Sequence, residues 1–144
     1  MIIRAMTLQD HGQLTQLLKE TAGVALREAD SEEAFSRYLH RNPGLSFVVE
    51  DEARQIVGCV MCGHDGRRGY LQHLVVRPEH RGKELGTRLY QRCIDKLATI
   101  GIEKTHIFVF RNNDNANLFW SGKGWQRRDD ICVYSLNISD NPNA

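Results

Sequence analysis

The spacing of hydrophobic residues changes along the chain between patterns typical of strands and patterns typical of helices. An apolar run at 2–6 predicts a strand, and the next two stretches have apolar residues three or four positions apart, which predicts amphipathic helices. The first helix follows a cap-like sequence at 7–10, and the second runs from about 30 to Pro43-Gly44. The apolar residues expected on their inner faces are Leu14, Leu17, Leu18, Ala34, Phe35, Tyr38 and Leu39.

Three β-rich runs follow at 46–50, 55–62 and 70–77, separated by short polar turns. Connections this short predict an antiparallel meander. A long helix is expected from about 82 to 100, and the β-rich run at 105–110 should lie parallel to the strand before that helix. The apolar stripe expected to bury the long helix consists of Leu85, Leu89, Cys93 and Leu97, with Ile94 beside it.

A short helix at about 114–121 and strands at 125–128 and 131–138 complete the order β-α-α-β-β-β-α-β-α-β-β. This order predicts an α/β (α+β) fold, with a mixed, mainly antiparallel sheet and flanking helices. The length of 144 residues suits one domain, expected over 1–140, with a frayed tail at 141–144.

Composition argues against several classes of function. The formal net charge is +1, which does not indicate a general nucleic-acid-binding surface, and no apolar run approaches the length of a membrane span. The first six residues are too short and interrupted for a signal peptide, and all four cysteines lie in apolar segments, which predicts reduced thiols in a cytoplasmic protein. Cys59 and Cys62 should point to opposite faces of a strand, and no second pair completes a metal site.

Candidate chemistry concentrates at 74–89, where an apolar strand meets a proline, a basic glycine-bearing turn and an amphipathic helix. The first N–H groups of a helix lack partners and its dipole favours negative charge, so the turn predicts a phosphate or pyrophosphate site. Arg81 and Lys83 add positive charge there. The glycine spacing fits neither a P-loop nor a dinucleotide fingerprint.

The segment Arg81-Gly82-Lys83-Glu84-Leu85-Gly86 resembles the pyrophosphate loop, Arg/Gln-x-x-Gly-x-Gly/Ala, of the GNAT superfamily of acyl-CoA-dependent N-acetyltransferases. Residues 113–125 are similar to a second family motif, Asn-x-x-Ala-x-x-aromatic/Leu-Tyr-x-x-x-Gly-Phe. The resemblance covers nearly the whole chain. It implies acetyl-CoA as co-substrate, without a metal, and direct acetyl transfer to a primary amine of a small molecule, peptide or protein. No nucleic-acid or membrane partner is implied, and a homodimer is left open.

The resemblance also assigns residues. Backbone groups of Leu74, Val75 and Val76 would lie beside the pantetheine arm and the acetyl group, at a splay between the fourth and fifth strands. Asn113 would either contact the cofactor or cap the short helix. The residues expected around the pyrophosphate are Arg81, Gly82, Lys83, Glu84, Leu85, Gly86 and Thr87.

Two residues depart from the family pattern. Glu84 stands where glycine is preferred, and Trp120 stands where the family has the tyrosine proposed to protonate the departing CoA thiolate. An indole N–H cannot supply that proton, but a thiolate lies only about 2 kcal/mol above its thiol at pH 7. Trp120 would instead pack on the pantetheine arm or in the core. Both departures support an alternative, a CoA-binding regulatory module with impaired catalysis.

An amine must lose its proton before it attacks, which calls for a base. His73, one residue before the fourth-strand motif, is the best candidate, although strand alternation does not fix its direction. His64 and Asp65, in the preceding turn, are weaker candidates.

Overall fold

A computed structural model describes residues 1–144, and the chain divides into two compact units, 1–107 and 108–144, which are treated separately. The helices and strands of the first unit are β1 (Ile2–Ala5), α1 (His11–Lys19), α2 (Glu32–Arg41), β2 (Phe47–Glu50), β3 (Ile56–His64), β4 (Gly69–Val76), α3 (Leu85–Thr99) and β5 (Thr105–Ile107). Three single-turn 3-10 helices are η1 (Leu8–Asp10), η2 (Glu28–Asp30) and η3 (Pro78–His80). None of the helices has the length and apolar character needed to cross a membrane.

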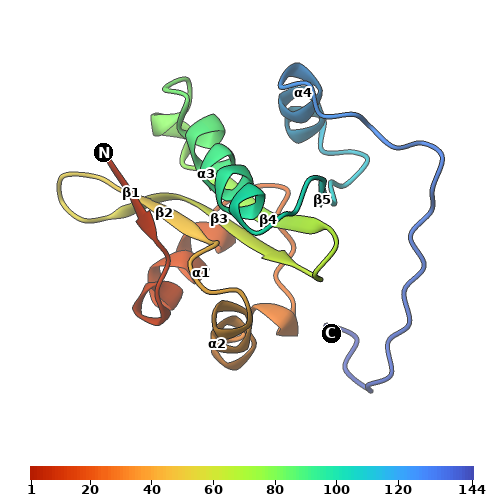
Figure 1. Cartoon of the computed structure of the whole chain (residues 1–144). Helices are drawn as coiled ribbons and strands as arrows, with labels where there is room; N and C mark the ends of the chain where they lie inside the picture. The colour runs from red at the N-terminus through yellow and green to blue at the C-terminus, as the bar shows by residue number, and fades with distance from the viewer. The chain divides into compact units, whose positions relative to one another are not determined.

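The sheet has the strand order β1-β2-β3-β4-β5. The first four strands pair antiparallel and β5 pairs parallel to β4, which confirms the predicted meander and crossover. Figure 1 shows α1 and α2 on one face of the sheet and α3 on the other. The two helical layers bury the sheet from both sides, so β3 is buried along almost its whole length.

The expected apolar faces are the ones that the fold buries. Three leucines of α1 and Phe35 of α2 lie in the core on one side of the sheet. On the other side, α3 buries residues at a spacing of four, because residues i and i+4 share one face of a helix. These are Leu85, Leu89, Cys93 and Leu97.

Two irregularities of β4 matter for function. Its pairing with β5 covers only Gly69 to Leu71, so the edge of β4 from Gln72 to Val76 has no strand beside it. On the β3 side, the register shifts by one residue between Gln72 and Val75, which makes a β-bulge. The pairing of β4 with β5 therefore ends after Leu71, while the expected splay between the fourth and fifth strands stays a prediction.

The second unit contains one helix, α4 (Asp114–Gly122), and no strand. The predicted strands at 125–128 and 131–138 are therefore wrong, and the strand expected at 105–110 ends at Ile107. Alternating apolar residues stabilise a strand only where a neighbouring strand and a packed face receive them. Here those side chains are exposed, namely Phe108, Phe110, Ile131, Val133, Tyr134, Leu136 and Ile138. A single domain over 1–140 and a frayed tail at 141–144 stay predictions.

Candidate active site

The open edge of β4 presents backbone groups. The N–H of Arg77 donates to the carbonyl of Val57 in the segment leading into β3 at 2.8 Å. Because successive N–H groups of a strand point in opposite directions, the N–H of Val76 points away from β3, toward the side that β5 leaves unpaired. Val75 is buried and pairs with Cys59, so its side chain packs in the core. The edge thus offers main-chain hydrogen bonds to an extended ligand.

The turn between β4 and α3 exposes the start of a helix. Gly82 has φ 79° and Glu84, the N-cap of α3, has φ 62°. No side chain caps α3 and no acidic residue lies in its first turn, so its first amides are left for an anion. A Cβ on Gly82 would meet nothing within 4 Å, so the backbone angle is what favours glycine there. These features fit a phosphate group.

Other residues of this turn contribute in different ways. The Nε of Arg81 donates to the carbonyl of Val76 at 2.9 Å, and Lys83 Nζ lies 3.4 Å from Nδ1 of His80. Leu85 is buried, so its side chain belongs to the core. The hydroxyl oxygen of Thr87 is buried without a hydrogen-bond partner.

His73 lies in the bulge of β4 with φ 51°, a left-handed conformation in which histidine is one of the enriched side chains. Its Nε2 lies 2.7 Å from Oδ1 of Asp30. A carboxylate accepts hydrogen bonds, so the proton of the ring sits on Nε2 and leaves Nδ1 as the basic nitrogen. Nδ1 has no hydrogen-bond partner in the structure. The bulge therefore carries an imidazole whose Nδ1 can accept a proton, in the part of β4 that β5 does not pair.

Asp30 is itself held from two further sides. Its Oδ2 accepts the backbone N–H of Arg27 at 2.9 Å, and its carbonyl oxygen lies 3.0 Å from Nε2 of His11. Burial alone would raise the pKa of Asp30, but the hydrogen bonds from His73 and Arg27 and the charges of His73 and His11 outweigh it and lower that pKa. Asp30 is thus ionised at neutral pH.

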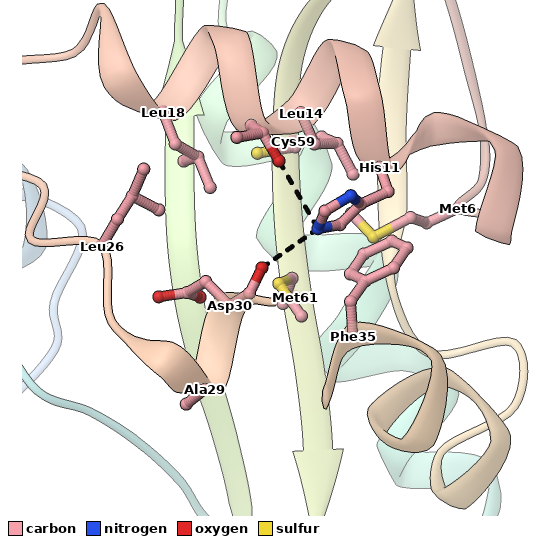
Figure 2. A pocket seen from close by; sticks show the side chains of 11 residues that line it. Met6, His11, Leu14, Leu18, Leu26, Ala29, Asp30, Phe35, Cys59 and Met61 are labelled. Atoms are coloured by element: carbon pink, nitrogen blue, oxygen red, sulfur yellow. Dashed lines mark hydrogen bonds between the residues drawn. The ribbon is translucent and has the colours of Figure 1, made fainter. Parts of the chain in front are cut away.

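A small hollow lies beside this cluster, between α1, η2, α2 and β3 (Figure 2). Its cavity volume is about 20 Å³, room for a water molecule. Figure 2 shows Nε2 of His11 joined at its wall to the carbonyl of Asp30 at 3.0 Å and to the hydroxyl of Thr15 at 3.5 Å. Its apolar lining includes Met6, Leu14, Leu18, Leu26, Phe35 and Met61.

Cys59 is the thiol nearest to His73 in the sheet. Its Sγ donates to the carbonyl of His73 at 3.3 Å, and the side chain is almost fully buried. Burial raises the pKa of Cys59 to about 12, which a hydrogen bond from the backbone of Val75 offsets only in part. At neutral pH this thiol is protonated and a poor nucleophile.

The weaker base candidates have structural roles in the turn between β3 and β4. Nδ1 of His64 accepts the N–H of Gly66 at 3.0 Å. Oδ1 of Asp65 accepts the N–H groups of Arg67 and Arg68, each at 2.8 Å, and these hydrogen bonds lower the pKa of Asp65. Both side chains therefore stabilise a tight turn.

Two predicted site residues belong to the second unit. The side chain of Asn113 accepts the N–H of Ala116 at 3.2 Å and so caps α4, while its cofactor contact stays a prediction. Trp120 is buried, with its ring centroid 5.1 Å from that of Phe119 and 4.5 Å from that of Trp125. Trp120 is thus a core aromatic of this unit, and its contact with a pantetheine arm also stays a prediction.

The sequence pattern does not single out Asp30 or His11, which the fold places beside His73. It indicates only a helix start near Asp30, and Ser31 is the residue that caps α2. The partner of Asp30, His73, lies 43 positions away, and no local pattern links residues at that separation. No group of three or more His, Cys, Asp or Glu side chains in residues 1–144 is arranged to hold a metal ion.

A mixed sheet whose parallel pair is joined only at its start, followed by a helix without a side-chain cap, is the arrangement of the acyl-CoA-dependent acyltransferase class. The sequence model of the acetyltransferase (GNAT) family matches residues 12–125, more than half of the chain. The chain therefore belongs to the GNAT acetyltransferase family and is an acyl-CoA N-acyltransferase.

Comparisons with individual proteins agree with this family assignment. The chain is 32% identical over 132 residues to an acetyltransferase of Yersinia pestis, covering 92% of this chain and 93% of that protein. It is 31% identical over 104 residues to an acetyltransferase of Sodalis glossinidius, covering 72% of each. The fold resembles the crystal structure of the PaiA N-acetyltransferase of Thermoplasma acidophilum in complex with coenzyme A, with a TM-score of 0.79 at 20% identity, covering 90% of this chain and 92% of that one.

Proposed function

We propose that this enzyme transfers the acetyl group of acetyl-CoA directly to a primary amine of a small molecule or of a peptide or protein. The observation that carries the proposal is the position of His73, in the bulge of β4 at the edge that β5 leaves open. Acetyl-CoA, when bound, supplies a thioester carbonyl for the amine to attack and a thiolate that leaves. The relative from Thermoplasma acidophilum was crystallised with coenzyme A, which supports this co-substrate.

In this proposal, the phosphates bind the first amides of α3, with Lys83 nearby, and the pantetheine arm follows the open edge of β4. The N–H of Val76 donates a hydrogen bond along this edge and stabilises negative charge on an oxygen held there. Nδ1 of His73 takes the proton of the attacking amine. The thiol of Cys59 is protonated and buried, which favours direct transfer over an acyl-enzyme.

The cellular location is part of the same proposal. Four free cysteines, three of them buried, support a reducing compartment such as the cytoplasm. A homodimer stays open.

The test is turnover of acetyl-CoA with a panel of primary amines, read as release of the CoA thiol and as acetylated product by mass spectrometry. The panel should contain amino acids, polyamines and peptides with free N-termini. His73→Asn keeps a side chain that adopts left-handed backbone angles, so it should fold while losing about 10²–10⁴-fold in kcat. CoA binding with no turnover of any amine would contradict the proposal and leave a binding module.

A further inference from the structure

Asp30 and Asp10 occupy equivalent positions in two 3-10 helices of the first unit. Each is the last residue of its helix, and each accepts the backbone N–H three residues earlier, from Arg27 at 2.9 Å and from Thr7 at 2.8 Å. These contacts orient each carboxylate in the same way. What differs is the side chain that each carboxylate then binds.

Asp10 binds the guanidinium of Arg4 through two oxygens, each at 2.8 Å. This pair joins η1 to β1, and both partners serve the fold. Asp30 instead binds Nε2 of His73, which comes from the bulge of β4. The carboxylate of Asp30 is mostly buried, with 18% of the side chain exposed, and His73 is exposed to 17%. A histidine is the one partner of the two that can take up a proton near neutral pH.

We propose that Asp30 is a positioning residue that holds the ring of His73 with its proton on Nε2, so that Nδ1 receives the proton of the acceptor amine. The inference rests on the proposed function of His73 and extends it to a second residue. The proton moves from the amine nitrogen to Nδ1 and the ring becomes an imidazolium, whose charge the carboxylate of Asp30 stabilises without being protonated itself.

The contacts around the pair support this role. His11 donates from Nε2 to the carbonyl oxygen of Asp30, and its ring packs on Phe35 at a centroid distance of 5.1 Å (Figure 2). Asp30 is therefore fixed at its carbonyl and at both carboxylate oxygens. The thiol of Cys59 donates to the carbonyl of His73 from the β3 side. Both members of the pair are thus held in place, which a positioning role requires.

The first arm of the test needs no acceptor. In the ¹⁵N-labelled protein, the His73 ring should carry its proton on Nε2, and that N–H should exchange slowly because a carboxylate holds it. The signal should be lost in Asp30→Ala and retained in the matched control Asp10→Asn. A proton on Nδ1 in the wild type, or an unchanged N–H signal in Asp30→Ala, would overturn the inference.

The second arm uses the amine found by the acetyltransferase assay. Asp30→Asn, which keeps the size of the side chain, should lower kcat about tenfold or more with little change in KM, and Asp30→Glu should recover part of the loss. Asp10→Asn should keep kcat within about twofold in the same assay. A raised KM at unchanged kcat would make Asp30 a ligand of the acceptor and overturn the positioning role.

The two hypotheses fail differently. Absence of acetyl transfer by the wild type, with the Nε2–H signal present, would contradict the proposed function. Transfer that depends on His73 but not on Asp30 would contradict the inference alone.

Discussion

Arg81 turns back on Val76: its Nε donates to the carbonyl oxygen of that residue at 2.9 Å. The carbonyl lies on the open edge of β4, so the guanidinium covers the last acceptor of the strand instead of extending away from the turn. The contact ties the start of the turn to the end of the strand. In the proposed function, phosphate binding then falls chiefly to the amides that begin α3 and to Lys83.

Substitution of Gly86 tests the phosphate site. Gly86→Asp adds a negative charge and a side chain in the first turn of α3, so the Kd for CoA should rise about tenfold or more. Isothermal titration calorimetry measures it. Gly12→Asp makes the same chemical change in the first turn of α1 and should leave the Kd unchanged. An unaltered Kd in Gly86→Asp would place the phosphates elsewhere.

Two substitutions of Glu84 distinguish the effect of its charge on CoA binding from the effect of its backbone conformation. It adopts φ 62°, where glycine is at ease and other residues are not. Glu84→Gly should tighten CoA binding by less than about tenfold, or 1.4 kcal/mol, because it removes an acid beside an anion. Glu84→Gln removes the charge alone and should reproduce most of that gain. Weaker binding of CoA by both variants would show that the carboxylate makes a favourable contact.

The lowered pKa of Asp10 predicts how the free energy of unfolding depends on pH. Burial would raise the pKa of Asp10, but its bonds to Arg4 and to the N–H of Thr7 outweigh burial and lower that pKa. A lowered pKa in the folded state gives stability that is present above the unfolded-state pKa of about 3.9 and is lost as pH falls through the folded-state pKa.

Asp10→Asn should therefore lower the free energy of unfolding by about 1–3 kcal/mol at pH 7, and by clearly less at pH 3. Urea unfolding at both pH values measures the difference. An equal loss at pH 7 and pH 3 would mean that the charge of Asp10 contributes nothing.

Trp120 should matter through packing and not through proton transfer. Trp120→Tyr and Trp120→Phe should show similar kcat at saturating acetyl-CoA, whereas Trp120→Ala should lose about 3–5 kcal/mol of stability in the aromatic group with Phe119 and Trp125. Turnover across a range of pH and thermal unfolding are the measurements. A Tyr variant many-fold faster than both wild type and Phe would show that an acid limits the rate.

The four thiols should differ sharply in reactivity. Cys132 is exposed, whereas Cys59, Cys62 and Cys93 are buried, and burial raises the pKa of Cys59. For Cys93, the neighbouring thiol of Cys62 and then burial raise the pKa. An aromatic disulfide reagent should react quickly with one thiol of the native protein and with four after unfolding. Cys132→Ser should remove the fast phase, and a fast phase that persists would contradict the structure.

The sequence was sufficient for the elements whose partners lie nearby. The meander from β2 to β4 follows from short turns, and α3 follows from apolar residues four apart. The run at 131–138 has the same local character as a strand, yet it forms none, because a strand depends on a partner that local composition does not specify. Cys132, in the same run, is exposed for the same reason.

In the candidate site, too, the parts made of residues close in sequence could be predicted, and the parts assembled by the fold could not. The turn proposed to bind an anion is contiguous in sequence, so its glycines and cations are evident from the sequence alone. The direction of His73 depends on a bulge, and its partner Asp30 comes from a loop that only the fold brings near. Both depend on tertiary structure, which no spacing rule encodes.

The left-handed backbone at His73 also restricts how this enzyme can change. Holding a residue other than glycine in that conformation costs about 1–3 kcal/mol, so selection for heat resistance alone should replace His73 with glycine. Asparagine and aspartate also adopt that conformation readily, whereas glutamate does so less often, as at Glu84. If His73 is the base of the proposed function, adaptation of this protein to new acceptors should leave position 73 intact and act on the loops around it.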